Sequence, residues 1–120
     1  MRLLEAIRRV DDLVSNAYKK GEKIKWLSEM DGMIYRTIMV PHGVTEPFEG
    51  YTDETPDDTY LLVPAPYDDA YLLWLESKIH YYNGEYTRYN NAAAAFGSIS
   101  QAYANEYNRT HSSGNTSFRG

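Results

Sequence analysis

Apolar side chains recur every three or four positions in the first part of the chain, which is the spacing of one face of an α-helix. In residues 2–14 the recurring positions hold leucine, isoleucine and valine, and most charged residues fall between them. A second stripe crosses residues 22–39, where it passes through either Met30 or Asp31. Pro41 lacks the amide hydrogen that a continuing helix needs, so we expect this helix to end before it. The two stretches predict an N-terminal helical hairpin.

A longer helical pattern follows Pro66, and its seam is rich in aromatic and small side chains rather than leucine. We predict helices over residues 67–83 and 85–110. The pair Asn83-Gly84 lies between them without shifting the spacing, which leaves two interpretations. Either Gly84 ends one helix and the next folds back against it, or one long helix runs through the glycine. The seam positions are Leu72, Leu75, Ile79, Tyr82, Tyr86, Tyr89, Ala93, Phe96, Ser100, Tyr103 and Tyr107.

The segment between the two helical regions has a different character. Residues 40–69 hold all five prolines and eight acidic residues, but no lysine or arginine. The rest of the chain carries nine acidic and twelve basic residues, so the net charge of −5 comes from this segment. We predict an irregular acidic loop over residues 40–66, with the apolar island 60–63 as a short extended stretch on the core. The loop is either a solvated linker or an ordered arm that docks on a neighbouring subunit.

These elements predict an all-α protein with an N-terminal helical hairpin, a long irregular acidic loop, and a long C-terminal helix or helical hairpin. The 120 residues suffice for one core, so we expect a single helical domain over 1–111 and a flexible tail over 112–120. The absence of cysteine from the sequence excludes disulfide bonds and thiol nucleophiles. Charge close to the N-terminus argues against a signal peptide, and no apolar run of the sequence is long enough to cross a bilayer.

Few residues are arranged for chemistry. Glu76 and His80 lie four positions apart on one predicted helical face, but zinc needs a third protein ligand. Neither His42 nor His111 lies in a motif that supplies one. The acidic loop lacks the spacing of a calcium-binding loop, and we find no glycine-rich phosphate cradle in the sequence. We therefore predict that the chain is not an enzyme and has no catalytic, cofactor-binding or metal-binding residues. A small enzyme would require Glu76 and His80 to be buried together in one pocket.

Tyrosine is the one unusual feature of the composition, with twelve in the chain. A domain of this size has difficulty burying so many phenol rings while satisfying every hydroxyl, so some of them should face water or a partner. Tyrosine and tryptophan often anchor protein interfaces. The alternatives are that the rings line the core or stack on a ligand. The candidates for a subunit or partner interface are Tyr81, Tyr86, Tyr89, Tyr103 and Tyr107.

Several stretches resemble small structural proteins that tailed phages and prophages encode among their head-assembly genes. They read WLSEMDG at 26–32, PYDDAY at 66–71, IHYYNGEYTRYNN at 79–91 and YANEYNRTH at 103–111. The chain is similar to the head–tail connector, or adaptor, proteins of this group. The resemblance implies a mainly helical protein without catalytic residues, which assembles as a homo-oligomeric ring beneath the portal. It also implies contacts with portal and tail-completion proteins, and a place in the virion neck after synthesis in the bacterial host cytoplasm.

An acidic surface would suit a neck protein, because carboxylates repel the phosphates of passing DNA over about 8–10 Å. The acidic net charge argues against a general grip on nucleic acid, so we expect DNA only as unbound cargo. We also expect part of residues 46–69 to face a channel or a neighbouring subunit and to order only on assembly. The alternative function is a small acidic helical protein that binds and regulates one partner as a monomer or dimer. The candidates for the channel-facing or docking loop are Glu46, Glu49, Asp53, Glu54, Asp57 and Asp58.

Overall fold

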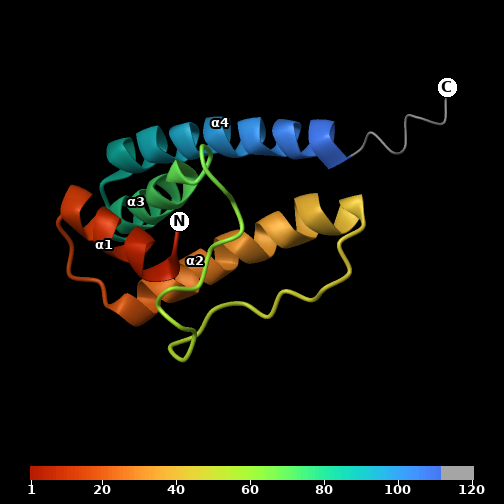
Figure 1. Cartoon of the computed structure of the whole chain (residues 1–120). Coiled ribbons are helices and arrows are strands. Elements are labelled where there is room, and N and C mark those ends of the chain that lie inside the picture. The colour runs from red at the N-terminus through yellow and green to blue at the C-terminus, as the bar shows by residue number, and fades with distance from the viewer. Residues whose placement is uncertain (112–120) are drawn as a thin grey trace, which may run out of the picture.

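The computed structural model describes residues 1–111, and the tail expected at 112–120 lies outside the described residues. The chain is all-α, as the sequence predicted, and no β-strand forms within the described part. None of the helices in residues 1–111 is both long and apolar enough to span a membrane. The four α-helices are α1 (Leu3–Leu13), α2 (Lys20–Ile34), α3 (Asp69–Tyr82) and α4 (Tyr86–His111) (Figure 1).

The helices form two hairpins that lie against each other. In Figure 1, α4 runs along one side of the molecule and α2 along the opposite side, with α1 and α3 between them at one end. α3 stops at Tyr82 and α4 starts at Tyr86, so the chain turns back at Gly84 and does not continue as one helix. Gly84 has a φ of 76°, a left-handed conformation that glycine adopts without strain. The interpretation in which Gly84 ends a helix is therefore correct.

The apolar faces of the helices meet in one core. Met30 and Asp31 are both fully buried, so the stripe on α2 passes through both of these positions and not through one of them. Burial of the aliphatic side chains supplies the main driving force for packing the hairpins together. The largest fully buried apolar side chains are Leu3, Val10, Leu27, Met30, Val63, Tyr71, Leu75 and Ile79.

The second helix does not stop where the sequence predicted. Regular α2 ends at Ile34, but the chain continues as a π-helical turn, η1 (Tyr35–Met39), and a 3₁₀ turn, η2 (Val40–His42). Pro41 lies inside η2, near the start of a turn, where its missing amide hydrogen is not needed. Helical structure therefore extends to His42 instead of ending at residue 39.

The acidic segment, residues 43–68, is irregular but lies on the chain's own helices. The N–H of Leu3 at the start of α1 donates to the carbonyl of Thr59 at 2.9 Å. Leu61 and Val63 of the predicted apolar island are buried in the core. These contacts hold the segment in place, so the expectation that it orders only on assembly is wrong. Nor does it need a neighbouring subunit as a surface to pack on.

Asp31 joins α2, the acidic segment and α3. Its buried carboxylate accepts hydrogen bonds from the hydroxyls of Tyr51 (2.5 Å) and Tyr71 (2.6 Å) and from the N–H of Leu62 (3.0 Å). The hydroxyl of Tyr71 also accepts a hydrogen bond from the N–H of Val63 at 2.6 Å. Burial raises the pKa of Asp31, although the hydrogen bonds oppose the shift. Burial and the nearby Asp31 carboxylate raise the pKa values of both tyrosines. One side chain thus ties together three segments that are distant in the sequence.

Candidate functional site

A hollow between α3 and α4, which we call the aromatic groove, has a volume of about 380 Å³. Its place follows from helical periodicity, because residues three or four apart share one face of a helix. Trp74, Lys78 and Tyr81 project from α3, and Tyr89, Ala93 and Phe96 project from α4. The complete lining is Trp74, Ser77, Lys78, Tyr81, Tyr82, Tyr89, Ala93 and Phe96.

The floor of the groove is held rigidly. The rings of Trp74 and Phe96 lie with their centroids 5.1 Å apart, which joins α3 to α4. The indole N–H of Trp74 donates to the carbonyl of Trp26 at 2.7 Å, so the ring is also fixed to α2. The ammonium of Lys78 lies 4.6 Å from the centre of the Trp74 ring, within the range of a cation–π contact. The groove therefore presents a preformed apolar surface with one cation beside it.

The rim of the groove exposes tyrosine. Tyr81, Tyr82 and Tyr86 are 48%, 57% and 60% exposed, although each carries a large apolar ring. The Tyr81 ring contacts those of Tyr86 and Tyr89, with centroids 6.1 Å and 5.3 Å apart. The Tyr82 ring stacks on Trp26 with an angle of 7° between the ring planes. The rings therefore form a continuous aromatic patch at the α3–α4 turn, which includes three of the five interface candidates: Tyr81, Tyr86 and Tyr89.

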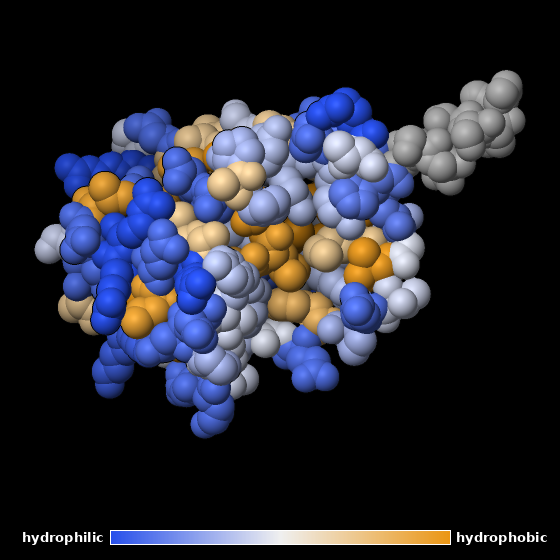
Figure 2. Space-filling view, in the orientation of Figure 1, coloured by the Kyte–Doolittle hydropathy of each residue, from blue (hydrophilic) through white to orange (hydrophobic). Residues whose placement is uncertain are grey.

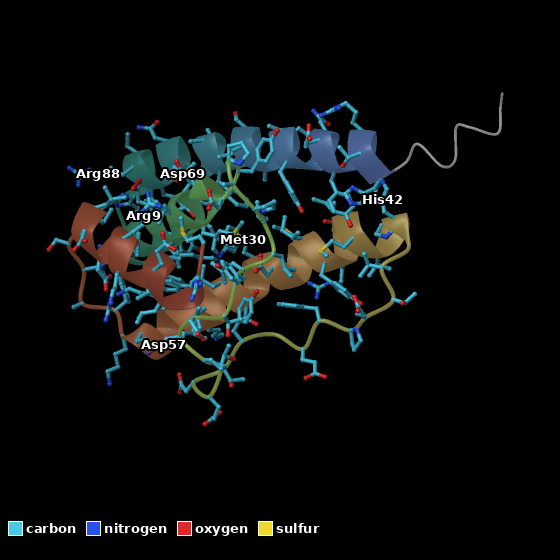
Figure 3. The ribbon with its side chains drawn as sticks, in the orientation of Figure 1. Arg9, Met30, His42, Asp57, Asp69 and Arg88 are labelled. Atoms are coloured by element: carbon cyan, nitrogen blue, oxygen red, sulfur yellow. The ribbon has the colours of Figure 1, made fainter. Side chains whose placement is uncertain are left out.

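The other two interface candidates are core residues. Tyr103 and Tyr107 are 6% and 8% exposed and belong to the chain's own core. The Tyr103 ring contacts Tyr67, and the Tyr107 ring contacts His42 of η2, which lies beside the C-terminal end of α4 (Figure 3). Burial raises the pKa of Tyr103 to about 12. Their assignment to a partner interface is thus corrected, because α4 turns this part of its seam towards η1, η2 and Tyr67.

A second hollow, of about 480 Å³, lies between α4 and the acidic segment. In Figure 2, apolar side chains gather near the middle of the view, below α4. Tyr103 and Tyr107 reach this hollow from α4, and Met39 reaches it from η1. The segment contributes Leu62, Pro64, Ala65, Pro66 and Tyr67 to its wall.

All six acidic candidates for the channel-facing or docking loop are exposed. Asp57 forms an ion pair with Lys20 at 2.8 Å (Figure 3 labels Asp57). Within the described residues it is the one of the six that forms an ion pair. Glu54 accepts a hydrogen bond from the Thr52 hydroxyl inside the turn at 3.3 Å.

Glu76 and His80 do not pair with each other. A ring nitrogen of His80 bonds Glu85 at 2.8 Å, and this hydrogen bond lowers the pKa of Glu85. His80 is buried, whereas Glu76 is only partly so, and both line a shallow hollow that also contains Arg88. Among residues 1–111 we find no group of three or more histidine, aspartate and glutamate side chains that could hold a metal ion.

Sequence reasoning missed part of the groove. It did not select Trp74, Lys78, Tyr82 or Phe96 as site residues. The spacing of Trp74, Lys78 and Tyr81 was a usable signal, since it places them along one face of a helix.

Comparison of the chain with protein-family descriptions, with curated proteins and with solved structures finds no match.

Proposed function

We propose that the chain is a structural protein of the head–tail connector, or adaptor, class of tailed phages and prophages. In this proposal it assembles as a homo-oligomeric ring beneath the portal and contacts portal and tail-completion proteins. It acts in the virion neck after synthesis in the bacterial host cytoplasm. The support is the resemblance of four sequence stretches together with the all-α fold. The observation that carries it furthest is the exposed aromatic patch at the α3–α4 turn.

The aromatic patch is suited to a protein partner. Tyr81, Tyr82 and Tyr86 each expose about half of their surface or more, and they are neighbours in space. Such rings cover a large area with few rotatable bonds, so they lose little conformational entropy on binding. A ring subunit needs extensive protein contacts and no reactive centre, which agrees with a surface of this kind.

The exposed negative charge of the acidic segment also supports the proposal. Glu46, Glu49, Asp53, Glu54 and Asp58 are exposed on residues 43–68, a region that contains no basic residue. In a neck, such a surface facing the channel would repel DNA phosphates and let the duplex pass without binding. DNA is then cargo and not a ligand.

The experiment is to image necks from particles of a phage or prophage that encodes this chain. We expect a ring of this protein beneath the portal in particles that carry the wild-type chain. Replacing Tyr81 and Tyr86 by serine should abolish incorporation while lowering the free energy of unfolding by no more than about 2 kcal/mol, because about half or more of each side chain is exposed. Tyr60→Ser is the matched control, since Tyr60 is 65% exposed but does not line the groove.

Necks that lack the chain would contradict the proposal, as would full incorporation of the Tyr81 and Tyr86 variant. A discrete complex with a single partner protein, seen by native mass measurement and without any ring, would instead support the alternative. In that alternative the same aromatic patch serves a small acidic protein that binds and regulates one partner as a monomer or dimer.

A further inference from the structure

The described residues of the aromatic groove offer hydrogen-bond donors but no carboxylate. Its rings form an apolar floor, and its rim offers hydrogen-bond donors: the ammonium of Lys78 and the phenol hydroxyls of Tyr81, Tyr82 and Tyr89. None of the described residues that line the groove is acidic. Glu29 approaches the ammonium of Lys78 only loosely, at 3.9 Å. A fitting occupant is therefore a segment with an apolar centre and carboxylates beside it.

One exposed segment of this chain has that chemistry. Residues 52–58 read TDETPDD, with Pro56 between two pairs of acids, and Pro56 is itself exposed. Hydrogen bonds fix the shape of this turn: the N–H of Thr52 donates to the Thr55 hydroxyl at 2.8 Å, and the N–H of Thr59 donates to the Pro56 carbonyl at 3.1 Å. Because it is already ordered, the turn loses little conformational entropy when it binds.

The turn does not fill the groove of its own chain. The carbonyl of Asp57 accepts a hydrogen bond from the N–H of Leu4 at 3.0 Å, and the Asp57 carboxylate pairs with Lys20. These contacts hold residues 52–58 beside the starts of α1 and α2. In Figure 1 the turn projects beyond α2, on the side of the molecule away from α4. Groove and turn are thus separate surfaces, and each is open to a neighbour.

We infer that the turn 52–58 of one copy docks in the aromatic groove of a second copy. Pro56 contacts the rings, and Asp53 and Glu54 face Lys78 and the phenol hydroxyls of the neighbour. This contact joins two different surfaces, and a head-to-tail contact of that type closes into a ring when the rotation between copies allows it. The inference rests on the proposed ring assembly and identifies the surfaces that build it.

Disulfide trapping tests the contact in the full chain, whose sequence contains no cysteine to interfere. Ala93→Cys places a thiol in the groove and Glu54→Cys places one on the turn. The matched control pairs Glu54→Cys with Ala102→Cys, an exposed position elsewhere on α4. When the two single-cysteine proteins are mixed at high concentration and oxidised, we expect at least about tenfold more cross-linked heterodimer from the groove pair, because docking raises the effective concentration of the thiols. Equal yields from the two pairs would overturn the inference.

Charge reversal gives an independent readout. Lys78→Glu alone, and Asp53→Lys with Glu54→Lys, should each weaken self-association about tenfold, and mixing the two variant proteins should restore it. Restoration cannot come from misfolding of either variant, so it would support the contact. Its absence between two variants that unfold in urea like the wild type would count against the contact. Necks that hold a ring whose subunits give no preferential cross-link would refute this inference and leave the proposed function standing. A preferential cross-link between chains that never enter a neck would refute the proposed function and leave the contact between groove and turn standing.

Discussion

The carboxylate of Asp31 lies where α2, the acidic segment and α3 meet, and it is the acceptor for three buried donors. A buried charge is costly unless hydrogen bonds replace the water it has lost. Here two phenol hydroxyls and one backbone N–H do so, and the hydroxyl of Tyr71 also accepts the N–H of Val63. We find no buried side-chain nitrogen or oxygen without a partner in residues 1–111.

Removing this acceptor should destabilise the fold strongly. Asp31→Ala leaves the hydroxyls of Tyr51 and Tyr71 and the N–H of Leu62 without their acceptor. We expect a loss of about 3 kcal/mol in the free energy of unfolding, measured by urea denaturation. Asp12→Ala, at an exposed position of α1, is the control and should change it by less than about 0.5 kcal/mol. Equal losses would show that Asp31 has no special role.

The same carboxylate should give the protein a defined pH dependence. Burial raises the pKa of folded Asp31 above that of the unfolded chain, so the folded state binds this proton more readily. Its contribution to stability is therefore fully present below the ordinary carboxyl pKa of about 3.9 and is lost as pH rises through the folded-state pKa. The stability of wild type minus that of Asp31→Asn should fall across this window in urea titrations. A difference that is constant or rises with pH would contradict the assignment.

At the scale of elements, the α3–α4 turn depends on one glycine. Gly84 has a φ of 76°, and a side chain there is strained although the space around it is open. Gly84→Ala should lower stability by about 1 kcal/mol. Gly97→Ala is the matched control, because Gly97 lies inside α4 with open space at its Cβ position, and alanine should stabilise the helix there by about 0.5–1 kcal/mol. Thermal unfolding of both variants distinguishes the two effects, and shifts of the same sign would contradict the prediction.

The elements themselves were largely predictable, and the deviations have local causes. The three-and-four spacing predicted all four helices with errors of a few residues at their ends, because burial of one face dominates helix formation in a protein. Periodicity could not decide between a break and a continuous helix at Gly84, because the spacing is the same on both sides. From the sequence, Pro41 is expected to end the helix because proline lacks an amide hydrogen. A 3₁₀ turn needs no amide hydrogen at this position, so helical structure continues through Pro41.

At the scale of the whole molecule, the acidic segment is part of the fold. The amides of Leu3, Leu61 and Leu62 donate to groups across the boundary between the segment and the helices. In the isolated chain these amides should exchange with solvent more slowly than those of Glu46 and Glu49, whose N–H groups donate to no residue in the described part of the chain. Hydrogen exchange resolved by NMR measures this directly. Uniformly fast exchange of the amides in the segment would contradict this prediction and support the interpretation of the segment as a solvated linker.

The candidate site was only partly predictable, because sequence spacing does not show which part of a seam meets another element. Tyr81, Tyr86, Tyr89, Tyr103 and Tyr107 follow one helical repeat, but the last two face η1, η2 and Tyr67 while Tyr81 and Tyr86 face solvent. What separates them is the turn at Gly84 and the path of residues 43–68, both properties of the tertiary fold. The burial of Asp31 escaped prediction for the same reason, since its partners are twenty and forty positions away.

Those sequence separations affect the order in which a newly made chain can fold. As the polypeptide leaves the ribosome, Asp31 emerges twenty residues ahead of Tyr51 and forty ahead of Tyr71. Until α3 is available, the N-terminal hairpin contains a carboxylate that has no second phenol to bind and must stay hydrated. We therefore expect the final packing of the hairpin to wait until the C-terminal half of the chain has been synthesised.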